Sequence, residues 1–261
     1  MNEVADDAKF SRTQTCHKRG SFPAVNVGRV AGQGQQYPME MNTGPFKPFA
    51  ARLLANASIR RIMGFQSRKQ SLPLLPRLGA NISLDAISIF APRLYAYGAN
   101  IAKTVCQKLG ISFNFDNSIF PCVAFNLGKS VWTWLHQDVM NCAFFWCVIT
   151  ALGNFDSRKG GHIILWDFNL VVEFPANASI AIPSATITHS NIPVGDDEER
   201  LSVTQYLPGG VARWVDNGCM TERELKESDR AAYDAMQARK AGRWAWGLSL
   251  WSKVEEILES S

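Results

Sequence analysis

The sequence lacks an uninterrupted apolar run long enough to cross a bilayer, so it predicts no membrane-spanning segment and no membrane partner. The first residues have neither the basic start nor the apolar core of a secretory signal, which predicts an intracellular protein. The six cysteines include no Cys-x-x-Cys pair, so we expect buried thiols in a reducing compartment and no structural zinc site. Histidine is scarce, with four in the chain, so each one can be weighed for a chemical role.

The residues that are present indicate one globular unit. A length of 261 residues with 46% hydrophobic residues suits one good-sized domain, or one domain with helical extensions. The formal net charge of +4 is compatible with a nucleic-acid partner but does not argue for one.

The pattern of residues divides the chain near residue 48. Residues 1–48 carry Gly, Gln, Pro and Asn with little periodicity, so we predict a flexible N-terminal segment there. Residues 49–261 form the predicted folded domain, which begins with a helical part over 49–110. The helical pattern breaks near Pro92, and Gly110 is placed to cap its end.

Residues 111–218 predict a β-rich core. Short apolar runs alternate with turn signals, for example at 126–128, 159–161 and 208–210. Many short strands at close spacing are typical of a sandwich or jelly roll. We therefore predict an α+β fold: a double-stranded β-helix, which is a cupin-like jelly roll with one open end, flanked by N- and C-terminal helices.

Residues 219–261 predict C-terminal helices. Thr221 to Glu224 have the pattern of a capping box, and a second helix with one buried stripe is expected after Gly247. We expect the tryptophans here to pack against the barrel and not to form a base-stacking platform. The predicted stripe is Leu248, Leu250, Trp251, Val254 and Ile257, and the packing tryptophans are Trp244, Trp246 and Trp251.

His136, Asp138 and His189 predict a metal site. Residues i and i+2 of a strand point to the same face, so His136 and Asp138 share a face, and His189 ends a second apolar run. Two imidazoles and one carboxylate are the facial triad of non-haem Fe(II) oxygenases, and three positions on the metal stay open. Two of those would take 2-oxoglutarate, and the third would take O2.

Arg200 predicts a site for the far carboxylate of 2-oxoglutarate. The run 200–206 is strand-like, with Arg200, Ser202 and Tyr206 on one polar face. A guanidinium can hold a carboxylate through two parallel hydrogen bonds, and Ser202 could add a hydroxyl.

Simpler interpretations of the same residues stay open at this point. A single His-x-Asp is a weak motif, and His136 could be a core histidine. Arg200 could end the solvated charge run that begins at Asp196. The order of the four residues, each at the end of a strand-like run, favours the oxygenase.

Several long segments of the chain resemble one family. From roughly residue 50 to the end, and most densely between 120 and 218, the sequence resembles the TET/JBP-type 2-oxoglutarate and Fe(II) dioxygenases, in the small form of mushroom-forming fungi. The segments that carry the resemblance are 61–67, 91–95, 120–126, 146–156, 160–167, 182–191, 202–206 and 210–218.

The resemblance implies an activity and a set of site residues. It makes 49–261 a dioxygenase domain, with His136, Asp138 and His189 as iron ligands and Arg200 as the 2-oxoglutarate arginine. We also predict that Ser202 and Asn126, both in matching segments, contact 2-oxoglutarate. The implied cofactors are Fe(II), 2-oxoglutarate and O2.

The resemblance also implies a substrate. Family members oxidise the methyl group of 5-methylcytosine, or of thymine in the JBP branch, so DNA is the expected partner and a nuclear location follows. A base must be flipped out of a duplex to reach the iron, and we predict Asn141 at its edge and Tyr206 stacked on it. A turn-forming role for Asn141 stays open.

The sequence departs from the family pattern at two places. The cysteine-rich region of the animal enzymes is absent, and residues 68–81 look like an insertion. We expect the DNA backbone to meet basic residues near the open end of the barrel, and His162 to have a structural role. These basic residues are Arg68, Lys69, Lys129, Arg158 and Lys159.

Two other classes of function remain open from the sequence. The first is a 2-oxoglutarate oxygenase that acts on RNA, protein or a small molecule. The second is a catalytically inactive barrel that serves as a binding module.

Overall fold

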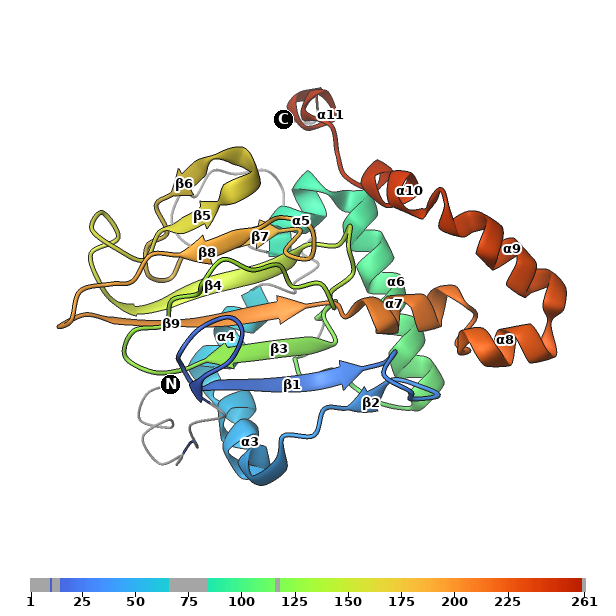
Figure 1. The fold of residues 1–261 in the computed structure, drawn as a ribbon, viewed down its shortest axis with the longest axis horizontal. Helices are drawn as coiled ribbons and strands as arrows, with labels where there is room; N and C mark the ends of the chain where they lie inside the picture. Colours follow the sequence, from blue (N-terminus) through green and yellow to red (C-terminus); the bar gives the residue numbers. More distant parts are fainter. Residues whose placement is uncertain (1–9, 11–14, 66–83, 116–117, 260–261) are drawn as a thin grey trace.

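Two antiparallel sheets and a set of helices make up the fold (Figure 1). The computed structural model describes residues 10, 15–65, 84–115 and 118–259. The larger sheet has the strand order β2-β1-β3-β9-β4-β7, and the smaller sheet has the order β6-β5-β8. The larger sheet consists of β2 (Met39–Glu40), β1 (Ala24–Val30), β3 (Cys122–Asn126), β9 (Glu199–Tyr206), β4 (Cys147–Asn154) and β7 (Ser179–Ile182). The smaller consists of β6 (Leu170–Val172), β5 (Ile163–Leu165) and β8 (His189–Asn191).

One face of the larger sheet is covered by helices. Leu53 of α3 (Lys47–Ala55) and Met63 of α4 (Ala57–Phe65) pack with apolar residues of β1, β3 and β9, including Leu201 and Val203. Further along this face lie α5 (Leu84–Phe90) and α6 (Pro92–Leu109), whose buried residues pack with Val148 of β4 and with α7 (Gly209–Asp216). Every second side chain of these strands therefore packs against the helices.

The opposite face of the larger sheet meets the smaller sheet. Cys147 and Ala151 of β4 form a buried cluster with Ile163 and Leu165 of β5, and Tyr206 packs at its edge. Since Leu201 and Val203 face the helices, the alternating residues of β9 from Arg200 to Tyr206 face the space between the sheets. The mixed helical and antiparallel fold agrees with the α+β prediction, and the strand predicted over 200–206 is confirmed.

The N-terminal part differs from the expected flexible segment over 1–48. Residues 24–30 form β1, which pairs along its length with β3. Val25 and Val27 are buried against the helices, whereas Gly28 has φ +131° and lies so close to Pro121 that a Cβ atom would be 2.1 Å from its carbonyl oxygen. The run carries Asn26 and Arg29 and is interrupted by Gly28, so its alternation was too weak a signal to identify a strand.

The ends of the helices agree only in part with the ends predicted from the sequence. Gly110 adopts the left-handed conformation at the end of α6, and Thr221 and Glu224 form both hydrogen bonds of the capping box before α8 (Glu222–Ser228). Next come α9 (Arg230–Lys240), α10 (Arg243–Ser249) and α11 (Val254–Glu259). The single helix predicted after Gly247 is wrong, because Gly247 lies inside α10 and the chain leaves the helix before α11.

The predicted C-terminal packing holds for only some residues. Leu250 and Trp251 pack at the core, whereas Val254 is 67% exposed and Trp244 is 45% exposed. Trp246 contacts the ring of Phe144 but keeps an exposed edge. The C-terminal helices extend away from the sheets as an arm (Figure 1). Little protein surface is therefore available to bury the apolar residues of the predicted stripe.

The cysteines are free thiols, as expected, but not all are buried. Cys122, Cys142 and Cys147 are buried, and burial raises the pKa of each to about 12, whereas Cys16 is exposed. Among the described helices, none combines the length and the apolar character that a membrane crossing needs.

Candidate metal centre

Two segments from different parts of the chain bring the predicted metal ligands together. His136 lies in a loop that pairs with the start of β8, and the backbone N–H groups of His136 and His189 each donate to the other's carbonyl at 3.0 Å. The Asp138 N–H donates to the Ser184 carbonyl at 2.8 Å, in the loop between β7 and β8. Backbone pairing therefore sets the spacing of all three side chains.

The three side chains can share one metal ion. One potential ligand atom from each of His136, Asp138 and His189 lies within 4.8 Å of the others. Within the described residues, this is the group of His, Cys, Asp and Glu side chains close enough together to hold a metal ion. His136 Nε2 is 3.8 Å from Asp138 Oδ1, and the two imidazole rings are 4.3 Å apart.

Hydrogen bonds set the tautomer of both imidazoles. Nδ1 of His136 lies 2.8 Å from the Trp134 carbonyl, and Nδ1 of His189 lies 2.8 Å from the Ile187 carbonyl. A carbonyl oxygen only accepts, so each Nδ1 carries the proton and each Nε2 keeps a free lone pair. Burial, and then the neighbouring His189, lower the pKa of His136 below its ordinary value of 6.5, which favours the neutral form that binds metals.

A network of side chains that the sequence did not indicate supports the ligands. Gln137 Nε2 donates to the Thr186 carbonyl at 3.0 Å and to Thr188 Oγ1 at 3.1 Å, which ties the first ligand segment to the second. Asp167 accepts a hydrogen bond from the Thr188 N–H at 2.6 Å. These contacts depend on the tertiary fold, so no local motif could have identified them.

Arg200 is the largest fully buried side chain of the described residues. It is 1% exposed, and one nitrogen, Nη1, donates to the Val131 carbonyl at 2.6 Å. Nε and Nη2 are buried without any partner, and the Phe174 ring lies 5.9 Å away. Burial lowers the pKa of Arg200 to about 10, so the side chain stays charged at neutral pH. A buried cation with two unused donors fits an anion that would lie between the sheets.

The other residues predicted to contact 2-oxoglutarate lie near Arg200. Ser202 follows on the same face of β9, and Asn126 is its register partner on β3. Asn126 Nδ2 donates to Ser202 Oγ at 2.9 Å, and Asn126 Oδ1 is buried without a partner. The structure therefore brings Arg200, Ser202 and Asn126 together. Polar atoms of Arg200 and Asn126 there have no hydrogen-bond partner.

The two predicted substrate residues lie toward the metal end. Asn141 closes a turn by donating its N–H to the Asp138 carbonyl at 2.8 Å, and its amide donates to Ser184 Oγ at 3.1 Å. Tyr206 is half-buried among apolar residues between the sheets, and its hydroxyl lies 3.8 Å from Met41 Sδ. Both a turn role and a contact role of Asn141 fit this geometry.

The basic residues expected near the open end lie elsewhere. His189 pairs with Leu165 at one end of β5, whereas Arg158 and Lys159 precede Ile163 at the other end and bind Asp156. Lys129 is exposed beside the backbone of Arg200, at that same distant end. The placement near the metal is thus wrong for these three residues, because turns at the two ends of a strand look alike in sequence. Arg68 and Lys69 lie outside the described residues.

His162 and Arg213 lie outside the group of candidate metal ligands. The His162 backbone carbonyl accepts from the Ile192 N–H, and its buried Nδ1 has no partner among the described residues, so the structural role of this side chain stays a prediction. Arg213, which could have held the carboxylate in place of Arg200, is half exposed and faces Glu222 at 4.0 Å.

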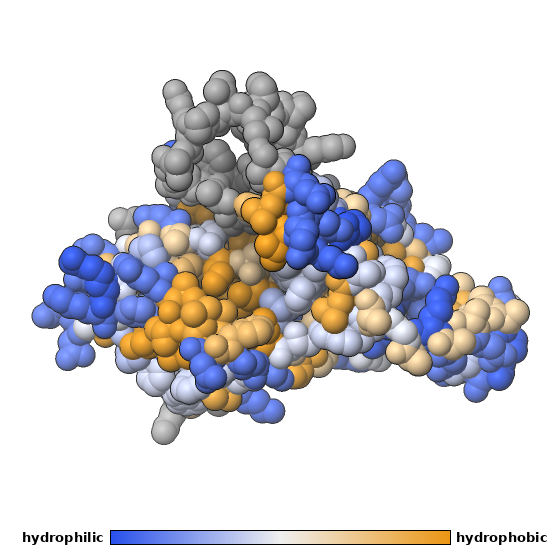
Figure 2. Space-filling view, turned by 90° about the horizontal axis from the view of Figure 1, so that it is seen from above, coloured by the Kyte–Doolittle hydropathy of each residue, from blue (hydrophilic) through white to orange (hydrophobic). Residues whose placement is uncertain are grey.

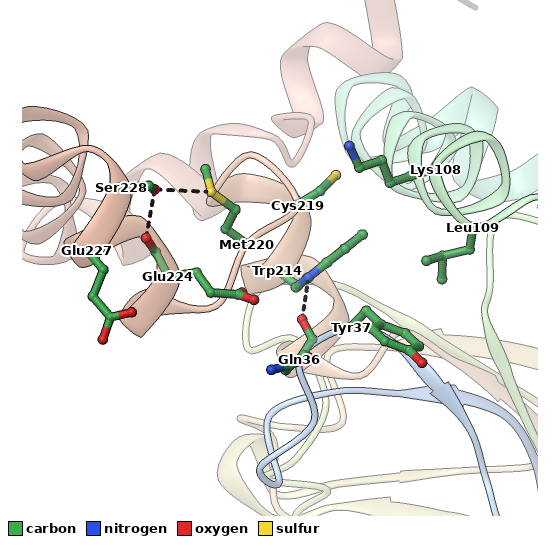
Figure 3. A pocket seen from close by; sticks show the side chains of 10 residues that line it. All are labelled: Gln36, Tyr37, Lys108, Leu109, Trp214, Cys219, Met220, Glu224, Glu227 and Ser228. Carbon is green, nitrogen blue, oxygen red and sulfur yellow. Dashed lines mark hydrogen bonds between the residues drawn. The ribbon is translucent and has the colours of Figure 1, made fainter.

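Two of the surface cavities that flank α7 differ in position. One, of about 1010 Å³, begins at Val139 and Asn141 beside the metal ligands and extends to α9 and α10. The other, of about 640 Å³, lies between the ends of α6 and α7, α8 and the loop before β2 (Figure 3). In that second cavity Trp214 donates to the Gln36 carbonyl at 3.0 Å, and no predicted site residue lines it.

Comparisons with known proteins give structural similarity without sequence similarity. No protein-family model matches the chain, and no curated protein matches its sequence. The solved structure of NgTET1 in complex with 5mC DNA aligns with a TM-score of 0.51 at 13% identity, over 77% of this chain and 64% of that one. An oxidoreductase of the 2OG-Fe(II) oxygenase family from Burkholderia pseudomallei aligns with a TM-score of 0.36 at 16% identity, over 73% and 71% of the two chains. The first comparison shows a shared fold, and this chain spans less than two thirds of that protein's length.

Proposed function

We propose that this protein is an Fe(II)- and 2-oxoglutarate-dependent dioxygenase built on a double-stranded β-helix. One observation carries the proposal: a His/His/Asp group and a buried arginine with two unpartnered nitrogens face the same space between two sheets. The donor set of His136, Asp138 and His189 suits Fe(II). When bound, iron with 2-oxoglutarate supplies O2 activation, with succinate and CO2 as products and one oxygen atom transferred to the substrate.

The residues of the chain bind and orient the reactants. Arg200 would hold one carboxylate of 2-oxoglutarate through Nε and Nη2, and Asn126 and Ser202 would line the same end. The backbone carbonyls of Trp134 and Ile187 hold the imidazoles in the tautomer that leaves Nε2 free. Apolar residues between the sheets, such as Ile163 and Phe174, exclude water from the co-substrate.

The proposed substrate is a methylated nucleobase in DNA, with 5-methylcytosine as the first choice. The resemblance of segments 120–126 and 182–191 to TET/JBP-type enzymes supports it, and so does the fold shared with NgTET1, whose structure contains 5mC DNA. Asn141 and Tyr206 lie toward the metal end, where a flipped base would enter. We assign to Asn141 a contact with the base edge and to Tyr206 a stacking contact.

Succinate release tests the proposed activity and separates it from the alternatives. Wild-type protein and His136→Ala would be incubated with Fe(II), ascorbate and 2-oxoglutarate, each with methylated DNA, unmethylated DNA or no DNA. We expect release by wild type that rises with methylated DNA. Release that DNA does not change would favour an oxygenase with another substrate. No release under any condition would favour a binding module.

A further inference from the structure

Arg19 lies beside the metal centre although it comes from the N-terminal part of the chain. Its Nη1 is 3.7 Å from Asp138 Oδ1, and the two side chains are 29% and 18% exposed. The same oxygen of Asp138 lies 3.8 Å from His136 Nε2. The guanidinium therefore faces the carboxylate oxygen that a shared metal would take.

The backbone that carries Arg19 is fixed in place. His17 and Gly20 exchange backbone hydrogen bonds of 3.0 and 3.1 Å, and the Trp134 N–H donates to the Arg19 carbonyl at 2.8 Å. Gly20 is buried, and a Cβ atom there would lie 2.7 Å from the Trp132 carbonyl oxygen. This hairpin is packed against the segment that leads to His136, so the position of Arg19 is a built feature of the site.

The charge of Arg19 changes the electrostatics of the site in one direction. With neutral imidazoles, Asp138 gives the ligand set a charge of −1, and Arg19 brings the cluster to zero. A nearby positive charge opposes the gain of further positive charge at a metal, because the two repel each other in a partly buried site. A cation on a carboxylate ligand also reduces the electron density which that ligand donates. Both effects favour Fe(II) over Fe(III).

We propose that Arg19 is a positioning residue that holds Asp138 and keeps the bound iron ferrous by raising its reduction potential. The inference rests on the proposed function, because it takes His136, Asp138 and His189 as the iron site. Lys18 offers a matched control, because it carries the same charge on the neighbouring residue but is exposed.

The reduction potential of the bound iron tests this proposal. Full-length protein loaded with iron, without 2-oxoglutarate, would be titrated by spectroelectrochemistry, in which the ion gives one electron to the electrode as Fe(II) becomes Fe(III). Arg19→Gln and Arg19→Met should each lower the potential, so that the ratio of ferric to ferrous iron at a fixed potential rises by about tenfold, or ~59 mV. Arg19→Lys, which keeps the charge, and Lys18→Gln should stay near wild type.

Metal titrations separate the possible outcomes. Binding of Mn²⁺ by each variant establishes that its site is formed, and two different substitutions guard against a folding defect in one of them. If Arg19→Gln or Arg19→Met binds Mn²⁺ and has the potential of the wild type, the role of Arg19 is overturned and the triad stands. If His136→Ala binds iron as tightly as wild type, the proposed metal site is wrong, and the inference falls with it.

Discussion

His136 and His189 face each other across an isolated antiparallel pair, with reciprocal backbone hydrogen bonds of 3.0 Å and rings 4.3 Å apart. This pair joins a loop to β8 and presents two imidazoles side by side. Since both Nδ1 atoms are held by carbonyls, both Nε2 atoms are free to bind. The pairing is thus the structural basis for the proposed metal site. Loss of either imidazole should therefore lower the affinity for metal.

Replacing His136 by alanine should abolish metal binding. One ligand of three is removed while the backbone pair can remain, so Mn²⁺ affinity measured by calorimetry should fall by more than about a hundredfold. His162→Ala is the control, because His162 lies outside the ligand group and should leave affinity unchanged. Retention of wild-type affinity by His136→Ala would contradict the ligand assignment.

Replacing Arg200 by lysine should weaken 2-oxoglutarate binding. The charge is kept, but the planar fork that carries Nε and Nη2 is lost. The dissociation constant of 2-oxoglutarate for the Mn²⁺-loaded protein should rise by about tenfold or more, with Mn²⁺ affinity itself nearly intact. Arg213→Lys is the comparison, and a larger effect there would move the carboxylate site to α7.

Metal affinity should depend on pH below the ordinary histidine range. The pKa of His136 lies below 6.5 because burial disfavours its charged form. Protons therefore compete with Mn²⁺ for His136 at pH values below its ordinary range, and affinity should fall as the pH drops below 6.5. The unfolded chain binds the proton more readily, so the free energy of unfolding of metal-free protein should also fall as pH drops through this range. A pH titration of both quantities checks the sign, and greater stability at lower pH would contradict it.

Replacing Gly98 by alanine should destabilise the helical layer. A Cβ atom on Gly98 of α6 would lie 2.5 Å from the ring of Phe145, which is buried. The clash should outweigh the better helix propensity of alanine and lower the free energy of unfolding by about 1–3 kcal/mol. Gly242→Ala is the matched control, since a Cβ atom there meets nothing within 4 Å. Urea unfolding measures both, and equal stabilities would show that the core at Phe145 can shift.

The two-residue period of a β-strand predicted how the polar residues of β9 are arranged. Arg200 and Ser202 were expected to share a face of one strand, and they do, as alternation requires. A fold with open-ended sheets was expected to bring His136 and His189 together, and β8 pairs with the loop that carries His136. The strand predicted for His136 and Asp138 is wrong, because both residues lie in a loop and His136 forms an isolated bridge to His189.

The sequence could not predict the contacts that depend on tertiary packing. Arg19 reaches Asp138 through a hairpin with no periodic pattern, and β1 is interrupted by Gly28, so its sequence does not stand out from a loop. Arg158 and Lys159 form a turn whose composition does not indicate the end of β5 on which it lies. An exposed apolar patch on the β5–β6 hairpin, with Phe168 and Val171, was likewise not predicted (Figure 2).

Mass spectrometry of nucleosides tests the central claim most directly. DNA carrying 5-methylcytosine would be incubated with the protein, Fe(II) and 2-oxoglutarate, digested to nucleosides and compared with a His136→Ala reaction. Our account predicts 5-hydroxymethylcytosine or a more oxidised form with wild type, in step with succinate, and none with the variant. Succinate production by wild type without any oxidised base, in duplex or single-stranded DNA, would contradict the proposed substrate.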